Sequence, residues 1–264
     1  MKGEVEIITP LMAKQYLATS KGNRFLKRGA VEKYARDIKA NKWLLNGETI
    51  IFDEDGVLKD GHHRMAAIIK AEHPIVSFVV RGVPKEDTEL IDGGCARTVS
   101  DNLKMSGKDI EFYSTANVSL ANFCIGKEKG ICTPSTSEVE DFILENYDAF
   151  CFCLDLSNKC KVNGIKFQNK VSLRAAAYYA YKNGVTKSTI LRFFEVVNGG
   201  FYESEKETAA IVFRNQLMQG DVSHSRKARN NLFVQAQEAI DCFDKGLPRK
   251  RPFKGEKNIY LGKE

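Results

Sequence analysis

Residues 50–70 contain the feature that most constrains the fold of this chain. Residues 50–58 alternate between two short apolar runs and an Asp-Gly turn, which is typical of a β-hairpin. A polar turn with a glycine follows at residues 60–64, and residues 65–70 have helical composition and spacing. The order of strand, turn, strand, glycine and helix predicts an α+β domain whose hairpin leads directly into a helix.

The turn Asp60-Gly61-His62-His63-Arg64 combines residue types that are suited to holding a phosphate. Glycine lets the backbone approach a ligand closely, and the first N–H groups of a helix and its dipole favour an anion. Arg64 adds a planar two-pronged donor, and the histidines add donors or acid–base groups near neutral pH. The alternative is an ordinary helix cap with Arg64 in a surface ion pair. The preceding apolar strand and the paired histidines favour the phosphate site.

Two other stretches contain candidate acidic and anion-binding residues. Glu48 follows an Asn-Gly turn at the start of a strand, where its carboxylate could reach Mg²⁺ or a hydroxyl group; a solvated edge residue is the alternative. Asp92 precedes two glycines and could bind a divalent cation or accept a proton, unless this stretch only connects domains. Arg97 and Thr98 stand at the start of the next expected helix, which is a favourable position for an anion.

The pattern of the chain changes near residue 98. Before it we expect strands at 5–8 and 75–80 and helices at 10–19, 30–40 and 84–90, besides the hairpin and its helix. After it, strand patterns nearly vanish, and helices are predicted at 98–106, 110–126, 136–148, 169–182, 187–198, 204–219 and 223–244. We therefore predict a mixed-sheet domain over 1–100, an all-helical domain over 101–247 and a basic extended tail over 248–264.

Composition limits the classes of partner. The chain has 264 residues, a formal net charge of +6 and seven cysteines, and it has no apolar run long enough for a membrane span. We expect a cytoplasmic protein with reduced thiols and no membrane association. Basic residues at Arg24, at Arg226, Lys227 and Arg229 and in the tail indicate a polyanion such as DNA, with a solvated basic face as the alternative. The sequence leaves open whether the chain forms an oligomer.

An ordered series of short motifs resembles the ParB N-terminal-like domain of the ParB/sulfiredoxin superfamily. More closely, the chain is similar to uncharacterised phage and plasmid proteins with that domain. The matching residues are Asn23-Arg24, Trp43, Asn46-Gly47-Glu48, Phe52-Asp53-Glu54-Asp55-Gly56, Asp60-Gly61-His62-His63-Arg64, Val79-Val80-Arg81-Gly82-Val83-Pro84, Asp92-Gly93 and Arg97. The resemblance covers residues 30–97, with the motifs in order over about seventy-five residues. It implies a small mixed-sheet domain whose glycine turn and following helix bind nucleotide phosphates.

Members of this superfamily use nucleotides differently. ParB proteins bind and hydrolyse CTP as DNA-loading clamps, sulfiredoxins use ATP to repair cysteine sulfinic acid, and related kinases phosphorylate free serine. ParB proteins usually carry a Gly-Glu-Arg-Arg turn, whereas this chain has Gly-His-His-Arg. Sulfiredoxins carry a cysteine where this chain has His62, so sulfinic-acid repair is not expected. The turn looks nearer to that of the kinase-like branch.

The resemblance implies a nucleotide-binding protein that is an NTP hydrolase or a kinase-like phosphotransferase, using ATP or CTP with Mg²⁺ in a bacterial or phage-infected cell. The alternative is a ParB-like DNA-binding module or a nuclease that acts on phage or plasmid DNA, and a third class is an interaction protein that keeps the fold without chemistry. Candidate roles are phosphate binding for Gly61, His63, Arg64, Arg97 and Thr98; catalysis for Glu48, Asp60, His62, His63 and Asp92; Mg²⁺ binding for Glu48 and Asp60; and nucleic-acid contact for Arg24, Arg226, Lys227 and Arg229.

Overall fold

The structure is a computed structural model that describes residues 1–20, 25–91, 97–105, 112–159, 171–219 and 225–261. It has the α+β class that the sequence predicts, with one mixed four-stranded sheet and a series of helices. The chain divides into two compact units. Unit 1 comprises residues 1–99 and 131–138, and unit 2 comprises residues 100–130 and 139–264.

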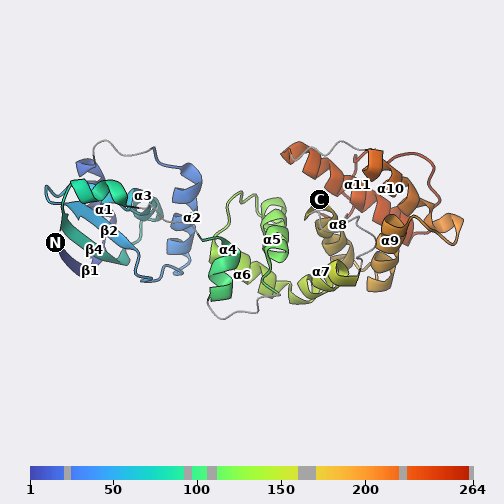
Figure 1. Cartoon of the computed structure of the whole chain (residues 1–264), viewed down its shortest axis with the longest axis horizontal. Coiled ribbons are helices and arrows are strands. Elements are labelled where there is room, and N and C mark those ends of the chain that lie inside the picture. Colours follow the sequence, from blue (N-terminus) through green and yellow to red (C-terminus); the bar gives the residue numbers. More distant parts are fainter. Residues whose placement is uncertain (21–24, 92–96, 106–111, 160–170, 220–224, 262–264) are drawn as a thin grey trace. The chain divides into compact units, whose positions relative to one another are not determined.

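Unit 1 is built on the four-stranded sheet (Figure 1). Its strands are β1 (Lys2–Ile8), β2 (Thr49–Asp53), β3 (Leu58–Asp60) and β4 (Ile75–Val83), arranged in the order β1-β4-β2-β3. Strand β4 pairs antiparallel with β1 and parallel with β2, and β2 pairs antiparallel with β3. The predicted hairpin is therefore β2–β3, and the predicted strand 75–80 extends to residue 83 as β4.

Unit 1 also contains three helices, α1 (Pro10–Thr19), α2 (Arg28–Lys39) and α3 (His62–Ala71), and α3 packs against both α1 and α2. Helix α1 begins as the sequence predicts, because the Thr9 side chain accepts a hydrogen bond from the Met12 N–H at 3.2 Å and Pro10 occupies the first turn. The predicted helix at 84–90 is a short 3₁₀ helix, η1 (Glu86–Leu90). The core between helices and sheet consists of Ile8, Ala13, Ala35, Ile38, Ile50, Phe52, Leu58, Met65, Ala67, Ile68, Ala71, Ile75 and Val79.

Unit 2 contains no strand among its described residues. Its helices are α5 (Thr115–Glu128), α7 (Tyr147–Lys159), α8 (Val171–Lys182), α9 (Lys187–Gly199), η3 (Glu205–Glu207), α10 (Thr208–Gln219), α11 (Arg226–Asp244), most of α4 (Val99–Met105) and the later part of α6 (Thr136–Glu145). The prediction of one helix over 136–148 is wrong, because α6 ends at Glu145 and α7 begins at Tyr147. The Asn146 side chain donates to the Phe142 carbonyl at 2.9 Å, which competes with continuation of the helix.

The start of α6 belongs to unit 1, which the sequence did not indicate. Ser135 and Glu138 form a reciprocal capping box: the Glu138 N–H donates to Ser135 Oγ at 3.2 Å, and the Ser135 N–H donates to Glu138 Oε2 at 2.7 Å. Both side chains also bond α2. Arg36 Nε donates to Glu138 Oε1 at 2.6 Å, and Ser135 Oγ donates to Asp37 Oδ1 at 2.6 Å. The capping residues thereby attach the start of α6 to α2 within unit 1.

Helices α10 and α11 of unit 2 bind the basic segment that follows α11. Phe253 is buried, and its backbone bonds the side chains of Gln216 on α10 and Gln235 on α11. The Glu238 carboxylate accepts hydrogen bonds from the three consecutive N–H groups of residues 255–257. Among the described helices, none is long and apolar enough to span a bilayer.

Candidate functional site

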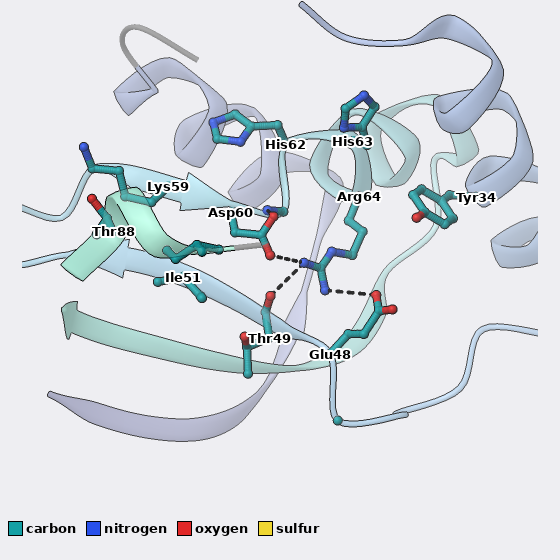
Figure 2. A pocket seen from close by; sticks show the side chains of 13 residues that line it. Tyr34, Glu48, Thr49, Ile51, Lys59, Asp60, His62, His63, Arg64 and Thr88 are labelled. Atoms are coloured by element: carbon teal, nitrogen blue, oxygen red, sulfur yellow. Dashed lines mark hydrogen bonds and ion pairs between the residues drawn. The ribbon is translucent and has the colours of Figure 1, made fainter. Parts of the chain in front are cut away.

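A cavity of about 650 Å³ opens in unit 1 beside the first turn of α3 (Figure 2). Strands β2 and β3, helices α2 and α3, and η1 all contribute to its wall. It is lined by Tyr34, Gly47, Glu48, Thr49, Ile51, Lys59, Asp60, Gly61, His62, His63, Arg64, Thr88 and Ile91. The structure thus brings Glu48 together with the whole predicted turn from Asp60 to Arg64.

Gly61 makes the sharp entry into α3 possible. Its backbone has φ of 103°, in the left-handed region that favours glycine, and a Cβ atom there would lie 3.1 Å from Ile50 Cγ1. Its N–H donates to Asp60 Oδ1 at 2.6 Å, and no side chain caps the helix. The positive end of the α3 dipole therefore faces the cavity without a neutralising carboxylate in the first turn.

Arg64 joins three elements at the floor of the cavity. Its Nη2 atom donates to the Thr49 carbonyl and to Asp60 Oδ2, both at 2.7 Å. Its Nη1 atom lies 3.6 Å from Glu48 Oε2 and makes no hydrogen bond, although only 7% of the side chain is exposed. A buried donor without a hydrogen bond costs about 1–3 kcal/mol, so this atom marks where a ligand acceptor would be favourable.

Lys59 brings a second cation to the cavity and is held by the hairpin turn. Its Nζ lies 3.3 Å from Oδ2 of the buried Asp53. Asp53 Oδ1 also accepts the N–H groups of Asp55 at 3.0 Å and Val57 at 2.8 Å. Burial alone would raise the pKa of Asp53, but these hydrogen bonds and Lys59 outweigh it and lower that pKa. Asp53 thus shapes the turn as a carboxylate and orients Lys59.

The two histidines connect α3 to the ends of the segment between α1 and α2. His62 Nε2 lies 2.5 Å from Ser20 Oγ. The backbone N–H of Lys27 donates to His63 Nε2 at 3.0 Å, which requires a neutral ring with its proton on Nδ1. The lone pair of His63 Nε2 is therefore engaged in positioning Lys27, and this nitrogen does not serve as a base in this arrangement.

The carboxylates predicted to hold Mg²⁺ already have partners. Asp60 uses one oxygen for the Gly61 N–H and the other for Arg64, whereas the Glu48 side chain is 64% exposed. The Arg64 guanidinium occupies the position between them that a cation would take. Among the described residues, no group of three or more His, Cys, Asp or Glu side chains could hold a metal ion.

The other predicted site residues do not line this cavity or cannot be assessed. Arg97 and Thr98 are exposed just before α4, and neither lines the cavity. Asp92 and Arg24 lie outside the described residues. The predicted nucleic-acid contacts Arg226, Lys227 and Arg229 are exposed near the start of α11, in unit 2.

Several cavity residues were not predicted from the sequence. Tyr34 carried no functional signal, because its position on one face of α2 predicts core packing. Thr88 and Ile91 reach the cavity only through the path of the chain after β4.

The sequence also did not indicate a functional role for Lys127, which lies beside the basic start of α11 in unit 2. Burial, followed by the charge of Arg226, lowers the pKa of Lys127, so these two cations repel each other.

Comparisons with family models, with curated proteins and with solved structures found no match to this chain.

Proposed function

We propose that unit 1 binds a nucleoside triphosphate, ATP or CTP, with the phosphates at the start of α3. The protein would then act as an NTP hydrolase or a phosphotransferase of the ParB/sulfiredoxin type. One observation supports this most strongly. The buried Nη1 of Arg64, which has no hydrogen-bond partner among the described residues, lies at the same cavity as the N-terminus of α3 and its left-handed Gly61.

The size and charge of the cavity support a ligand of this class. Pockets for small molecules and cofactors usually measure about 300–1,000 Å³, and this cavity of about 650 Å³ falls within that range. Lys59, Arg64 and the helix dipole favour an anion. Because Asp60 and the Thr49 carbonyl fix the guanidinium of Arg64, little side-chain entropy is lost when a phosphate oxygen binds Nη1.

Phosphoryl transfer requires mainly positioning and neutralisation of charge, and the cavity residues suit both tasks. In our proposal the first turn of α3 and Lys59 hold the phosphates, and a phosphate oxygen at Arg64 Nη1 displaces the Glu48 carboxylate. Asp60 positions Arg64.

Asp60 fits poorly as a ligand for Mg²⁺, since both of its oxygens are already engaged. Mg²⁺ is commonly held by one or two carboxylates together with substrate phosphates. We therefore propose that any Mg²⁺ enters with the triphosphate, and we assign no step of the reaction to it.

Titration calorimetry with ATP and CTP, with and without Mg²⁺, tests this proposal. We expect the wild-type chain to bind at least one of the two and Arg64→Ala to weaken binding at least about tenfold, as for loss of a charge-assisted hydrogen bond. Arg28→Ala is the matched control, because Arg28 is an exposed arginine on α2 and does not line the cavity. Absence of binding, or equal binding by Arg64→Ala and the wild type, would contradict the proposal.

DNA binding by unit 2 is a second candidate function. Arg226, Lys227 and Arg229 near the start of α11, together with Lys127, support it. Cations at a helix N-terminus oppose the helix dipole, and a polyanion would relieve this and their mutual repulsion. Fluorescence anisotropy with duplex DNA should show affinity that falls steeply with salt and that drops in the triple alanine variant at 226, 227 and 229. Affinity that is independent of salt, or unchanged in this variant, would count against the candidate.

A further inference from the structure

The two sides of the cavity differ in chemistry. Figure 2 shows Tyr34 and Glu48 on one side of Arg64, and Lys59, Thr88 and His62 on the other. One side thus presents an aromatic ring and an exposed carboxylate, and the other presents the lysine. This asymmetry matches a ligand with a flat polar ring at one end and negative charge at the other.

Tyr34 has the placement of a stacking surface. Its ring and that of Trp43 form a T-shaped pair, with centroids 5.9 Å apart and planes at 86°. Trp43 is itself anchored, because its Nε1 donates to the Val76 carbonyl at 3.3 Å. Trp43, which is bonded to β4, therefore supports the Tyr34 ring, and this ring also forms part of the cavity wall. A rigid aromatic face loses little entropy when a second ring stacks on it.

The side of the cavity with Tyr34 also has open space beside Gly47 and the Glu48 carboxylate, which can distinguish between ligand rings. A Cβ atom built on Gly47, next to Glu48, would meet no described atom within 4 Å. The carboxylate of Glu48 is 64% exposed and accepts hydrogen bonds only. It would favour a ring with an amino group and disfavour a ring with a carbonyl oxygen at the same position.

We propose that Tyr34 forms the stacking face of a nucleobase subsite and that Glu48 favours bases with an exocyclic amino group. This proposal rests on the proposed nucleotide-binding function and specifies which side of the cavity takes the base. It predicts that ATP and CTP bind more tightly than UTP, because uracil has a carbonyl where cytosine has an amine.

Calorimetry with CTP, ATP and inorganic triphosphate tests the stacking role, because triphosphate has no base. Stacking of one base on an aromatic side chain contributes roughly a 5- to 150-fold change in affinity. We expect Tyr34→Ala to lose that factor for CTP and ATP and to bind triphosphate like the wild type. Tyr34→Phe keeps the ring and should bind all three ligands within about threefold of the wild type.

Two outcomes would overturn the stacking role: CTP and ATP binding unchanged in Tyr34→Ala, or an equal loss of triphosphate binding in that variant. Failure of the proposed function looks different, since the wild type would then bind neither nucleotide nor triphosphate. Tyr34→Leu guards against misfolding, because leucine preserves apolar packing on Trp43 without an aromatic face. The fluorescence of Trp43, the single tryptophan of the chain, reports whether that packing is retained.

Glu48→Gln tests the choice of base, measured without Mg²⁺ so that a metal-ligand role does not contribute. A hydrogen bond to a charged acceptor supports a wild-type preference for CTP over UTP of about tenfold. Glutamine presents an amide that can accept or donate, so the preference should fall to within about threefold. An unchanged preference in Glu48→Gln, or equal binding of CTP and UTP by the wild type, would overturn the assigned role of Glu48.

Discussion

At the scale of single residues, Gly61 and Arg64 shape the proposed phosphate site. Gly61 allows the backbone to turn into α3 against Ile50, and Arg64 then ties β2, β3 and α3 together through Thr49 and Asp60. The sequence predicted the location of this turn because glycine and arginine have few equivalents in such roles. It did not predict the Thr49 carbonyl as a partner of Arg64, since only the folded hairpin brings this carbonyl to the guanidinium.

Gly61→Ala should destabilise the protein more than Gly56→Ala. Both positions have positive φ, which costs an L-residue about 1–2 kcal/mol. Only the Cβ at position 61 would also crowd Ile50, because the Cβ at Gly56 meets no described atom within 4 Å. Urea unfolding of the two variants checks this. Equal losses of stability would show that contact with Ile50 is unimportant.

Asp53→Asn should lower the free energy of unfolding at pH 7 by about 1 kcal/mol, the difference between hydrogen bonds to charged and to neutral acceptors. The folded-state pKa of Asp53 lies below its usual value of about 3.9, so its stabilisation is present above that pH. It is lost as the pH falls through the lowered pKa. The variant and the wild type should therefore converge in acid.

Urea titrations between pH 7 and pH 2 measure that convergence. Asp55→Asn is the control in the same turn, because the Asp55 side chain is 57% exposed and pairs only with the exposed Lys85. A penalty for Asp53→Asn that stays constant with pH would contradict the role of the Asp53 charge.

At the scale of elements, residue patterns within a few positions of each other predicted where helices and strands begin. Features that depend on contacts in the folded chain were not predicted. Thr9-Pro10 marked the start of α1, and the Asp-Gly turn marked the hairpin. The end of α6 was missed, because a side-chain bond from Asn146 to Phe142 decides it within a continuous apolar pattern. Tyr34 was missed as a cavity residue because helical periodicity does not distinguish a ring in a cavity wall from a ring in a core.

Ser135→Ala should cost more stability than loss of an ordinary helix cap. An N-cap substitution typically costs about 1 kcal/mol, and Ser135 also donates to Asp37 on α2. Thr186→Ala at the start of α9 is the matched control, because Thr186 accepts the Thr189 N–H and its contacts with the Ser188 and Thr189 hydroxyls stay within its own turn. In thermal unfolding, the midpoint temperature of Ser135→Ala should be lower than that of Thr186→Ala. The reverse order would contradict the fastening of α6 to α2.

At the scale of the whole molecule, the chain forms a sheet-containing unit with a nucleotide-sized cavity and a helical unit without strands among its described residues. The sequence pattern changes near residue 98, and the first division between the units falls between residues 99 and 100. The inclusion of residues 131–138 in unit 1 was not predictable, because it depends on Arg36 and Asp37, about a hundred residues earlier in the chain.

Nucleotide binding should stabilise the protein by mass action. A ligand at one hundred times its dissociation constant adds about 2.7 kcal/mol to the free energy of unfolding of the part that binds it. Hydrogen exchange should therefore slow in α3 and β2 when CTP or ATP is added, and the amides of α8 and α11 should change little. Protection confined to α8 and α11 would place the ligand in unit 2 and contradict the proposed site.

The amide NMR spectrum of the full chain, titrated with CTP or ATP, tests the central claim most directly because it reports the site of binding residue by residue. The account predicts that the largest shifts occur at residues 61–64, with smaller shifts at Lys59 and Tyr34. A spectrum that does not change with either nucleotide, or that changes only in unit 2, would contradict it.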